Sequence, residues 1–177
     1  MRKSILTALL LLPLAACQRS AESGPTEIGG KLFIFNYRLS TAVYEIALRK
    51  TGTIPDGSTV TAEYENPAGG APLVQTMKIF PFWQKIALES PPLHCVVKDR
   101  PYAVKIRIEG PKGEVIQTLE TTVISSLDQT VLAAKPLVTG PAYDKNPEVF
   151  KADGTADYSP DKACPATAKA ANGNGGT

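Results

Sequence analysis

The sequence predicts an all-β fold, a small antiparallel β-sandwich, for the central part of this 177-residue chain. Between residues 31 and 139 apolar and polar residues alternate, and this period of two is typical of strands with one buried face. Turn residues interrupt the alternation about every ten residues, as expected of short strands joined by tight connections. The roughly 109 residues of this region match the size of one sandwich domain.

The range 102–109 has the clearest strand pattern. Its apolar positions alternate with Ala, Lys, Arg and Glu, so one face is expected to be buried and the other hydrated. The sequence Gly-Pro-Lys-Gly at 110–113 predicts a turn, and 114–125 is expected to return as the hairpin partner. The expected buried face comprises Tyr102, Val104, Ile106 and Ile108.

A second hairpin is expected from 42–50 and 58–65, which flank Ile-Pro-Asp-Gly at 54–57. In such a turn Pro fixes φ and Gly accepts a positive φ. The range 42–50 also fits a short helix, because Val43 and Ile46 would share a helical face; we assign it as a strand. Further strands are expected at 31–37, 73–79, 85–89 and 130–138.

The N-terminus has the pattern of an export signal. Arg2 and Lys3 precede an apolar run over 5–16, and Leu14-Ala15-Ala16 leads into Cys17. A helix of about 12 residues spans roughly 18 Å, which is short of the ~30 Å hydrocarbon layer. We therefore do not expect this run to cross a membrane.

The four residues that end in Cys17 resemble the lipobox of bacterial lipoproteins. The resemblance implies a diacylglyceryl group on the Cys17 thiol, cleavage before Cys17 and acylation of the new amine, for example by palmitate. Two or three acyl chains hold a protein firmly to a bilayer. In the enterobacterial sorting pattern that this sequence resembles, an Asp after the lipidated Cys retains a lipoprotein in the inner membrane. Gln18 occupies that position, so the resemblance implies an anchor on the periplasmic face of the outer membrane. The alternative is that Cys17 is a late residue of an ordinary signal peptide.

These patterns divide the chain into four parts. A signal peptide is expected at 1–16, a lipidated flexible tether at 17–30, the β-sandwich at 31–139 and a partly disordered C-terminal tail at 140–177. The tether is polar and contains Gly and Pro, and the end of the tail offers nothing to pack.

Charge and cysteine content indicate which partners are excluded and how the cysteines pair. The chain has 19 Lys and Arg against 17 Asp and Glu; without Arg2 and Lys3 the charges balance, which argues against a nucleic-acid partner. After lipidation of Cys17, Cys95 and Cys164 remain, and an even pair in an exported protein predicts a disulfide. The alternative is two unpaired thiols.

The sequence contains no recognisable catalytic, metal or cofactor motif. His94 is the single histidine, and it is expected to be structural or solvent-exposed. Glu63 and Glu65 share one strand face, but nothing in the sequence marks them as an acid–base pair, so a solvated face is preferred. The spacing of Asp153, Asp157 and Asp161 suggests a calcium loop, but the required Gly and the final Glu are missing, and we reject it.

Two groups of residues are candidates for partner recognition. Phe80, Phe82 and Trp83 surround a proline, and a proline in a sheet must lie at an edge or a bulge. Part of this apolar area is therefore a candidate contact for a partner. Packing of the three rings in the core is the preferred interpretation. Four basic residues are expected on the hydrated side of one strand, where acidic neighbours favour an ordinary charged surface. They are Lys98, Arg100, Lys105 and Arg107.

Three segments together resemble the YbaY/YscW lipoprotein family, which includes pilot lipoproteins of type III secretion. They are Gly-Thr-Ile-Pro-Asp-Gly-Ser-Thr-Val at 52–60, Phe-Pro-Phe at 80–82, and Arg-Pro-Tyr-Ala-Val-Lys-Ile-Arg-Ile at 100–108. With the Thr-rich strand that follows, the resemblance covers 50–125. It implies a β-sandwich on a lipid anchor and, for some members, escort of a secretin to the outer membrane.

The sequence therefore predicts a non-enzymatic module that binds a protein or assists envelope assembly, with no cofactor. The alternatives are a secretin pilot lipoprotein and a passive structural lipoprotein of the envelope.

Overall fold

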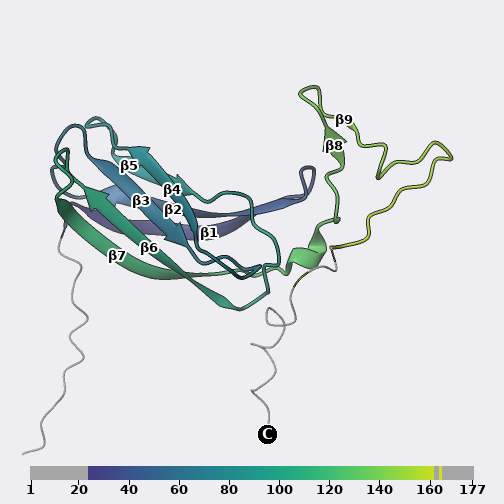
Figure 1. The fold of residues 1–177 in the computed structure, drawn as a ribbon, viewed down its shortest axis with the longest axis horizontal. Helices are drawn as coiled ribbons and strands as arrows, with labels where there is room; N and C mark the ends of the chain where they lie inside the picture. Colours follow the sequence, from purple (N-terminus) through teal and green to yellow (C-terminus); the bar gives the residue numbers. More distant parts are fainter. Residues whose placement is uncertain (1–23, 162–163, 165–177) are drawn as a thin grey trace, which may run out of the picture.

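The computed structural model of the protein describes residues 24–161 and 164, and seven of its strands form two antiparallel sheets (Figure 1). One sheet has the order β1-β2-β5 and the other the order β4-β3-β6-β7. The strands of the first are β1 (Thr26–Asn36), β2 (Thr41–Lys50) and β5 (Lys85–Glu89). Those of the second are β3 (Thr59–Tyr64), β4 (Leu73–Lys78), β6 (Pro101–Glu109) and β7 (Val115–Ile124). The predicted all-β sandwich is confirmed. The hairpin expected from 42–50 and 58–65 is wrong, because β2 and β3 lie in different sheets and the turn between them crosses from one sheet to the other.

The first strand begins earlier than the sequence predicted. β1 starts at Thr26, whereas residues 26–30 were expected to belong to the tether. Two glycines, Gly29 and Gly30, obscure the pattern there, and the register against β2 shifts at this point. The buried Gln117 of β7 explains the early start, because its amide bonds both the backbone N–H and the backbone C=O of Thr26.

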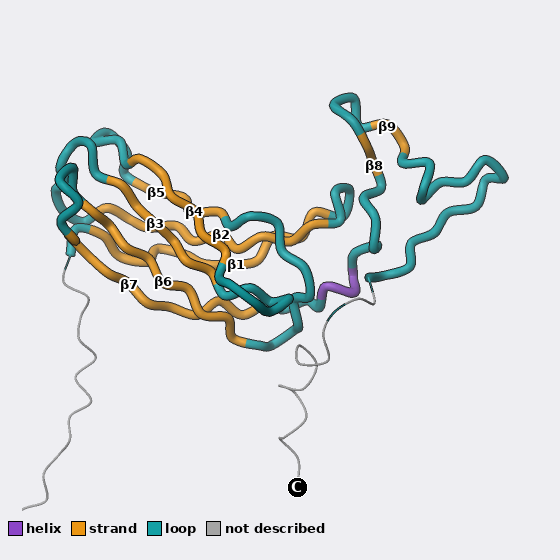
Figure 2. The backbone as a smooth tube through the Cα atoms, viewed as in Figure 1, coloured by secondary structure: helices purple, strands orange, loops and turns teal. Residues whose placement is uncertain are grey.

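The strand expected at 130–138 is wrong. The short 3₁₀ helix η1 (Gln129–Val131) forms instead, and Asp128 caps it by accepting a hydrogen bond from the Thr130 N–H. Beyond it, β8 (Val138–Thr139) and β9 (Asp144–Lys145) pair as a two-stranded ribbon. We call residues 129–161 together with Cys164 the C-terminal extension; its described part, seen as loops and the small ribbon in Figure 2, is built outside the two sheets.

The core lies between the two sheets and contains the predicted inward face of β6. Tyr102, Val104, Ile106 and Ile108 are all buried, as the alternation predicted. Tyr44 of β2 stacks on Tyr64 of β3 across the sandwich, with ring centroids 5.4 Å apart. Aromatic contacts of this kind therefore join the two sheets in addition to aliphatic packing.

A tyrosine corner lies at the start of β6. The Tyr102 hydroxyl accepts a hydrogen bond of 2.7 Å from the Val97 backbone N–H, five residues upstream. A tyrosine near the start of a strand that bonds the backbone a few residues upstream also occurs in immunoglobulin-like sandwiches. Burial raises the pKa of Tyr102 and outweighs the opposing effect of that hydrogen bond and of Arg100. The strand orders and this corner place the fold among the Greek-key β-sandwiches.

The sandwich has two different ends. At one end, which we call the proximal pole (left in Figure 1), the described chain begins at residue 24, just before β1. This pole also carries the connections 51–58, 79–84 and 110–114. The opposite end, the distal pole, carries the β1–β2 turn at 37–40, the connections 65–72 and 90–100, and the C-terminal extension (Figure 1).

Replacing Tyr64 by phenylalanine is expected to stabilise the protein by about 1 kcal/mol, because a buried hydroxyl without a hydrogen bond costs free energy that a phenyl ring does not. The Tyr64 hydroxyl is buried and has no hydrogen-bond partner among the described residues. Urea unfolding measures the change. In the matched control Tyr44→Phe the lost hydroxyl donates to the Glu65 carbonyl at 3.0 Å, so this variant should be destabilised. A loss of stability in Tyr64→Phe would contradict the prediction.

Candidate functional site

The aromatic residues singled out in the sequence form a closed turn at the proximal pole. The Trp83 N–H donates to the Phe80 carbonyl at 3.0 Å, so that Pro81 and Phe82 occupy the tip. Phe82 is 75% exposed and Phe80 43% exposed, whereas Trp83 is half-buried against the core. Core packing was the preferred interpretation for all three, and it is wrong for the two phenylalanines.

The end of β2 holds this turn in place. The Lys50 N–H donates to the Gln84 carbonyl at 3.0 Å, and the Lys50 ammonium donates to the Pro81 carbonyl at 2.7 Å. The three rings contact one another, with the centroids of Phe80 and Trp83 5.0 Å apart. Phe82 is therefore displayed by a supported turn whose φ at position 81 is fixed by proline.

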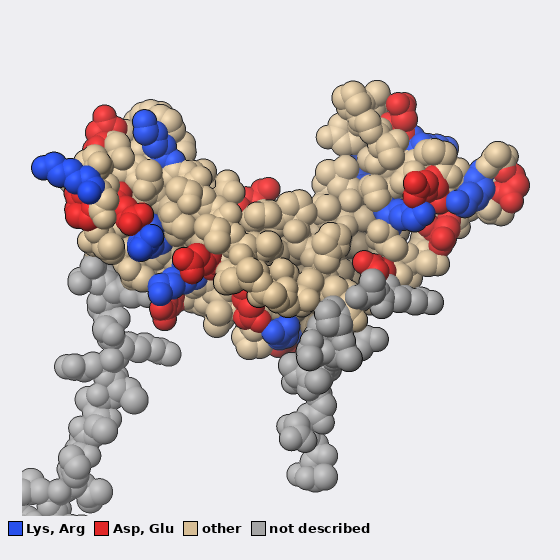
Figure 3. Space-filling view, in the orientation of Figure 1, with Lys and Arg blue, Asp and Glu red and all other residues tan. Residues whose placement is uncertain are grey.

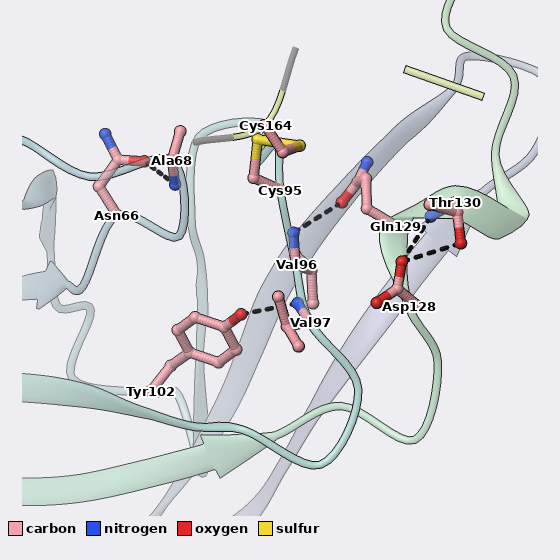
Figure 4. The surroundings of a disulfide bond; sticks show 10 residues. All are labelled: Asn66, Ala68, Cys95, Val96, Val97, Tyr102, Asp128, Gln129, Thr130 and Cys164. Atoms are coloured by element: carbon pink, nitrogen blue, oxygen red, sulfur yellow. Dashed lines mark hydrogen bonds between the residues drawn. A yellow bond between two sulfur atoms is a disulfide. The ribbon is translucent and has the colours of Figure 1, made fainter. Parts of the chain in front are cut away.

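A disulfide joins the C-terminal extension to the distal pole. Cys95 and Cys164 are bonded, with their Cα atoms 5.2 Å apart (Figure 4). Beside the bond, η1 docks on the same segment: the Gln129 N–H donates to the Val96 carbonyl at 2.7 Å, and the Gln129 side chain accepts from the Val96 N–H. The predicted pairing of the two cysteines is thus present in the structure, and it closes a loop of 69 residues.

The extension also contacts the β1–β2 turn. The Leu137 N–H donates to the Arg38 carbonyl at 2.8 Å, and the Ser40 hydroxyl donates to the Lys135 carbonyl at 2.8 Å. The Arg38 guanidinium lies 5.1 Å from the centre of the Tyr143 ring, a cation–π distance. These contacts hold the turn and the extension together.

Several large apolar side chains are exposed on these two segments. We call Tyr37, Leu39, Val131 and Tyr143 the distal surface; they are 53%, 38%, 40% and 53% exposed. In Figure 3 the upper outline of the molecule dips between the left end of the sandwich and the extension on the right, and mostly uncharged atoms line this dip. Exposed apolar area on a supported scaffold is typical of a binding surface.

The predicted basic cluster is neutralised by acidic neighbours. Lys105 lies 3.9 Å from Glu120 and Arg107 lies 3.5 Å from Glu109. Lys98 and Arg100 precede β6 rather than lying on it, which corrects their expected placement; Lys98 lies 4.0 Å from Asp99 and Arg100 lies 2.6 Å from Glu65. An ordinary charged surface is the better description of this face.

An open depression of about 990 Å³ covers the outer face of the four-stranded sheet. Glu63 lies opposite Lys105 and Lys105 lies opposite Glu120 across the strands, so the charges alternate along its floor. The Glu65 carboxylate accepts hydrogen bonds from the Arg100 guanidinium at 2.6 Å and from the Ala103 N–H at 2.9 Å. The described lining therefore presents polar and charged contacts but no activated nucleophile or base.

The other residues considered for chemistry have local roles. His94 is exposed, one of the two outcomes expected for it. Asp153 accepts hydrogen bonds from the hydroxyl and N–H of Thr155, and these bonds lower the pKa of Asp153. Asp157 accepts a hydrogen bond from the Ser159 N–H, and the Ser159 side chain and this N–H together lower the pKa of Asp157. Within residues 24–161 and 164, no group of His, Cys, Asp or Glu is arranged to hold a metal ion.

The predicted signal peptide and Cys17 lie outside the described residues, as does the end of the tail at 165–177. In the part of the chain that is described, no helix has the length and apolar character needed to cross a bilayer. The sequence did not single out the distal surface, because its residues come from two segments 90 or more positions apart and alternation gives no signal in turns.

Comparisons with known proteins identify no family. No family model and no curated protein matches the chain. Among solved structures, one similar chain is an endonuclease/exonuclease/phosphatase from Beutenbergia cavernae DSM 12333, with a TM-score of 0.28 and 14% sequence identity over 54% of this chain. The match spans about a quarter of that structure's length, 27%, and supports no argument about fold or activity. The resemblance to the YbaY/YscW lipoproteins stays a prediction.

Proposed function

We propose that this protein is a lipid-anchored envelope lipoprotein whose β-sandwich is a non-enzymatic module that binds a protein partner. Cys17 is the anchor in this proposal, on the periplasmic face of the outer membrane. The observation that carries the binding role is the distal surface, where exposed apolar side chains are held by the disulfide and by contacts with the β1–β2 turn.

The distal surface suits a protein rather than a small molecule. Tyr37 and Tyr143 offer large amphipathic rings, the residue type enriched where proteins meet. Because the disulfide and Gln129 order the extension in advance, little conformational entropy would be lost when a partner binds.

Site-directed crosslinking in intact cells tests this proposal. A photo-crosslinking residue at position 37 or 143 is expected to capture a protein that mass spectrometry of the tagged lipoprotein identifies. The matched control places the same residue at Thr118, which is exposed on the outer face of β7. Capture from the distal positions but not from Thr118 supports the proposal.

The identity of a captured protein decides between the functional alternatives. A secretin would assign the pilot role, and β-barrel assembly proteins or porins would assign a general envelope role. Equal crosslinking at all three positions, or none at any, would contradict a dedicated binding surface and favour a passive structural lipoprotein.

A further inference from the structure

We infer that the aromatic turn at the proximal pole, Phe80-Pro81-Phe82-Trp83, docks into the lipid headgroup region of the membrane that carries the anchor. The occupant of this exposed apolar site is thus a lipid surface. The inference rests on the proposed lipid anchor at Cys17 and adds an orientation of the folded domain and a second membrane contact.

The turn lies next to the point where the chain enters the sandwich. The Pro25 carbonyl accepts hydrogen bonds from the N–H groups of Thr51 and Gly52, at 2.8 and 3.1 Å. Lys50, the preceding residue, bonds Gln84 and Pro81 on the other side of β2. Because β1 and β5 both flank β2, the start of the domain and the aromatic turn are about two strand spacings, roughly 10 Å, apart.

The anchor cannot lie far from this pole. Six residues separate Cys17 from Gly24, where the described structure begins. A chain of that length spans at most about 25 Å even when fully extended. The distal pole lies roughly 30 Å further along the strands, as the nine residues of β6 indicate. A lipid on Cys17 would therefore bring the proximal pole to the bilayer.

The composition of the turn suits the membrane interface. Tryptophan concentrates at the level of the lipid headgroups, where its amphipathic ring contacts both acyl chains and water, and phenylalanine is a common apolar contact in segments that lie in this interface. Phe82 and Phe80 are exposed, and Trp83 is partly buried against the core while its ring contacts both phenylalanine rings. The domain can bury these rings in lipid without unfolding.

Basic residues surround the aromatic turn. Lys78 and Lys85 flank it along the chain, Lys50 touches it, and 66–88 contains no acidic residue. The acidic side chains elsewhere at this pole have local partners: Glu27 pairs with Arg49, and Asp56 and Glu114 accept backbone N–H bonds. Glu109 pairs with Arg107. Ammonium groups placed beside exposed rings are positioned to contact lipid phosphates.

The protein contains a single tryptophan, so the proposed site carries its own fluorescent reporter. The test uses the mature lipidated protein in vesicles of phosphatidylethanolamine and phosphatidylglycerol that contain acyl-brominated lipid, which quenches tryptophan at close range. We expect strong quenching of Trp83 and shielding from acrylamide. With Phe82→Ser the docked fraction should fall roughly tenfold, since burial of a phenyl ring supplies most of the gain. Tyr158→Ser, which removes a ring that is 59% exposed in the C-terminal extension, should leave quenching unchanged.

A reporter at the other pole completes the design. In Trp83→Phe combined with Tyr37→Trp, the fluorescence should be insensitive to brominated lipid, because the distal pole points away from the membrane. Quenching of both reporters alike, or of neither, would overturn the inference. Shielding of Trp83 that requires added envelope protein would also overturn it and assign the turn to a protein partner.

The inference and the proposed anchor fail in distinguishable ways. A lipidated protein whose Trp83 is not quenched retains its anchor but refutes the docking contact. A protein that is not lipidated, and is released from membranes, refutes the proposed anchor on which the docking contact depends.

Discussion

Replacing both Cys95 and Cys164 by serine is expected to lower the free energy of unfolding by about 4 kcal/mol. The disulfide closes a loop of 69 residues, and a crosslink over that length removes roughly this much conformational free energy from the unfolded chain. Urea unfolding followed by the fluorescence of Trp83 measures the change. Wild-type protein treated with a reductant serves as a second version of the same experiment and should unfold at the same urea concentration as the double variant.

The contacts around the disulfide determine which part of the protein loses most stability when the bond is removed. Without the disulfide, the extension is attached to the sandwich by non-covalent contacts such as the Gln129–Val96 and Leu137–Arg38 hydrogen bonds. Because these contacts are weaker than a covalent bond, we expect the extension to open before the sandwich unfolds. Limited proteolysis should then cut within 132–160 in the double variant and spare the wild type. Unchanged urea resistance together with unchanged proteolysis would contradict a structural role for the bond.

Replacing Gln117 by leucine is expected to cost about 3 kcal/mol, because it leaves buried polar groups of Thr26 without partners. The Gln117 side chain accepts from the Thr26 N–H at 3.1 Å and hydroxyl at 2.8 Å and donates to the Thr26 carbonyl at 2.9 Å. Thr26 is 1% exposed and Gln117 5% exposed. Thermal or urea unfolding measures the loss.

Thr26→Val provides the matched control for Gln117→Leu. It removes only the hydroxyl contact and keeps both backbone bonds, so its cost should be about 1 kcal/mol. Hydrogen exchange at residues 26–30 should rise in Gln117→Leu, because these residues would detach from the sandwich edge. Equal stability of Gln117→Leu and wild type would show that β1 is held by its pairing with β2 alone.

The sequence predicts those strands whose side chains alternate strictly. β6 and β7 were anticipated almost to the residue, because each has one buried and one hydrated face. The first residues of β1 were not anticipated, since Gly29 and Gly30 carry no side-chain pattern and the bond that orders Thr26 comes from a residue 91 positions away. In 130–138 the apolar residues suggested a strand, yet the Asp128 cap and Pro136 direct the chain into a 3₁₀ turn and a loop.

The candidate site was predictable only in part. Proline at position 81 indicated a break in the sheet, but which of its aromatic neighbours face outward depends on the contacts of Lys50 and on the packing of Trp83. The pairing of Cys95 with Cys164 followed from their number and the expected export. The distal surface did not, because it is assembled by tertiary contacts between Arg38 and Tyr143.

The lipid anchor is the central claim of this account, and intact-mass and peptide mass spectrometry of the membrane fraction test it most directly. We predict a mature chain that begins at Cys17 and carries a diacylglyceryl thioether and an acylated amine. A Cys17→Ala variant should lose the modification and leave the membrane fraction. A mature chain that begins at another residue, or an unmodified Cys17 in a soluble protein, would contradict the account.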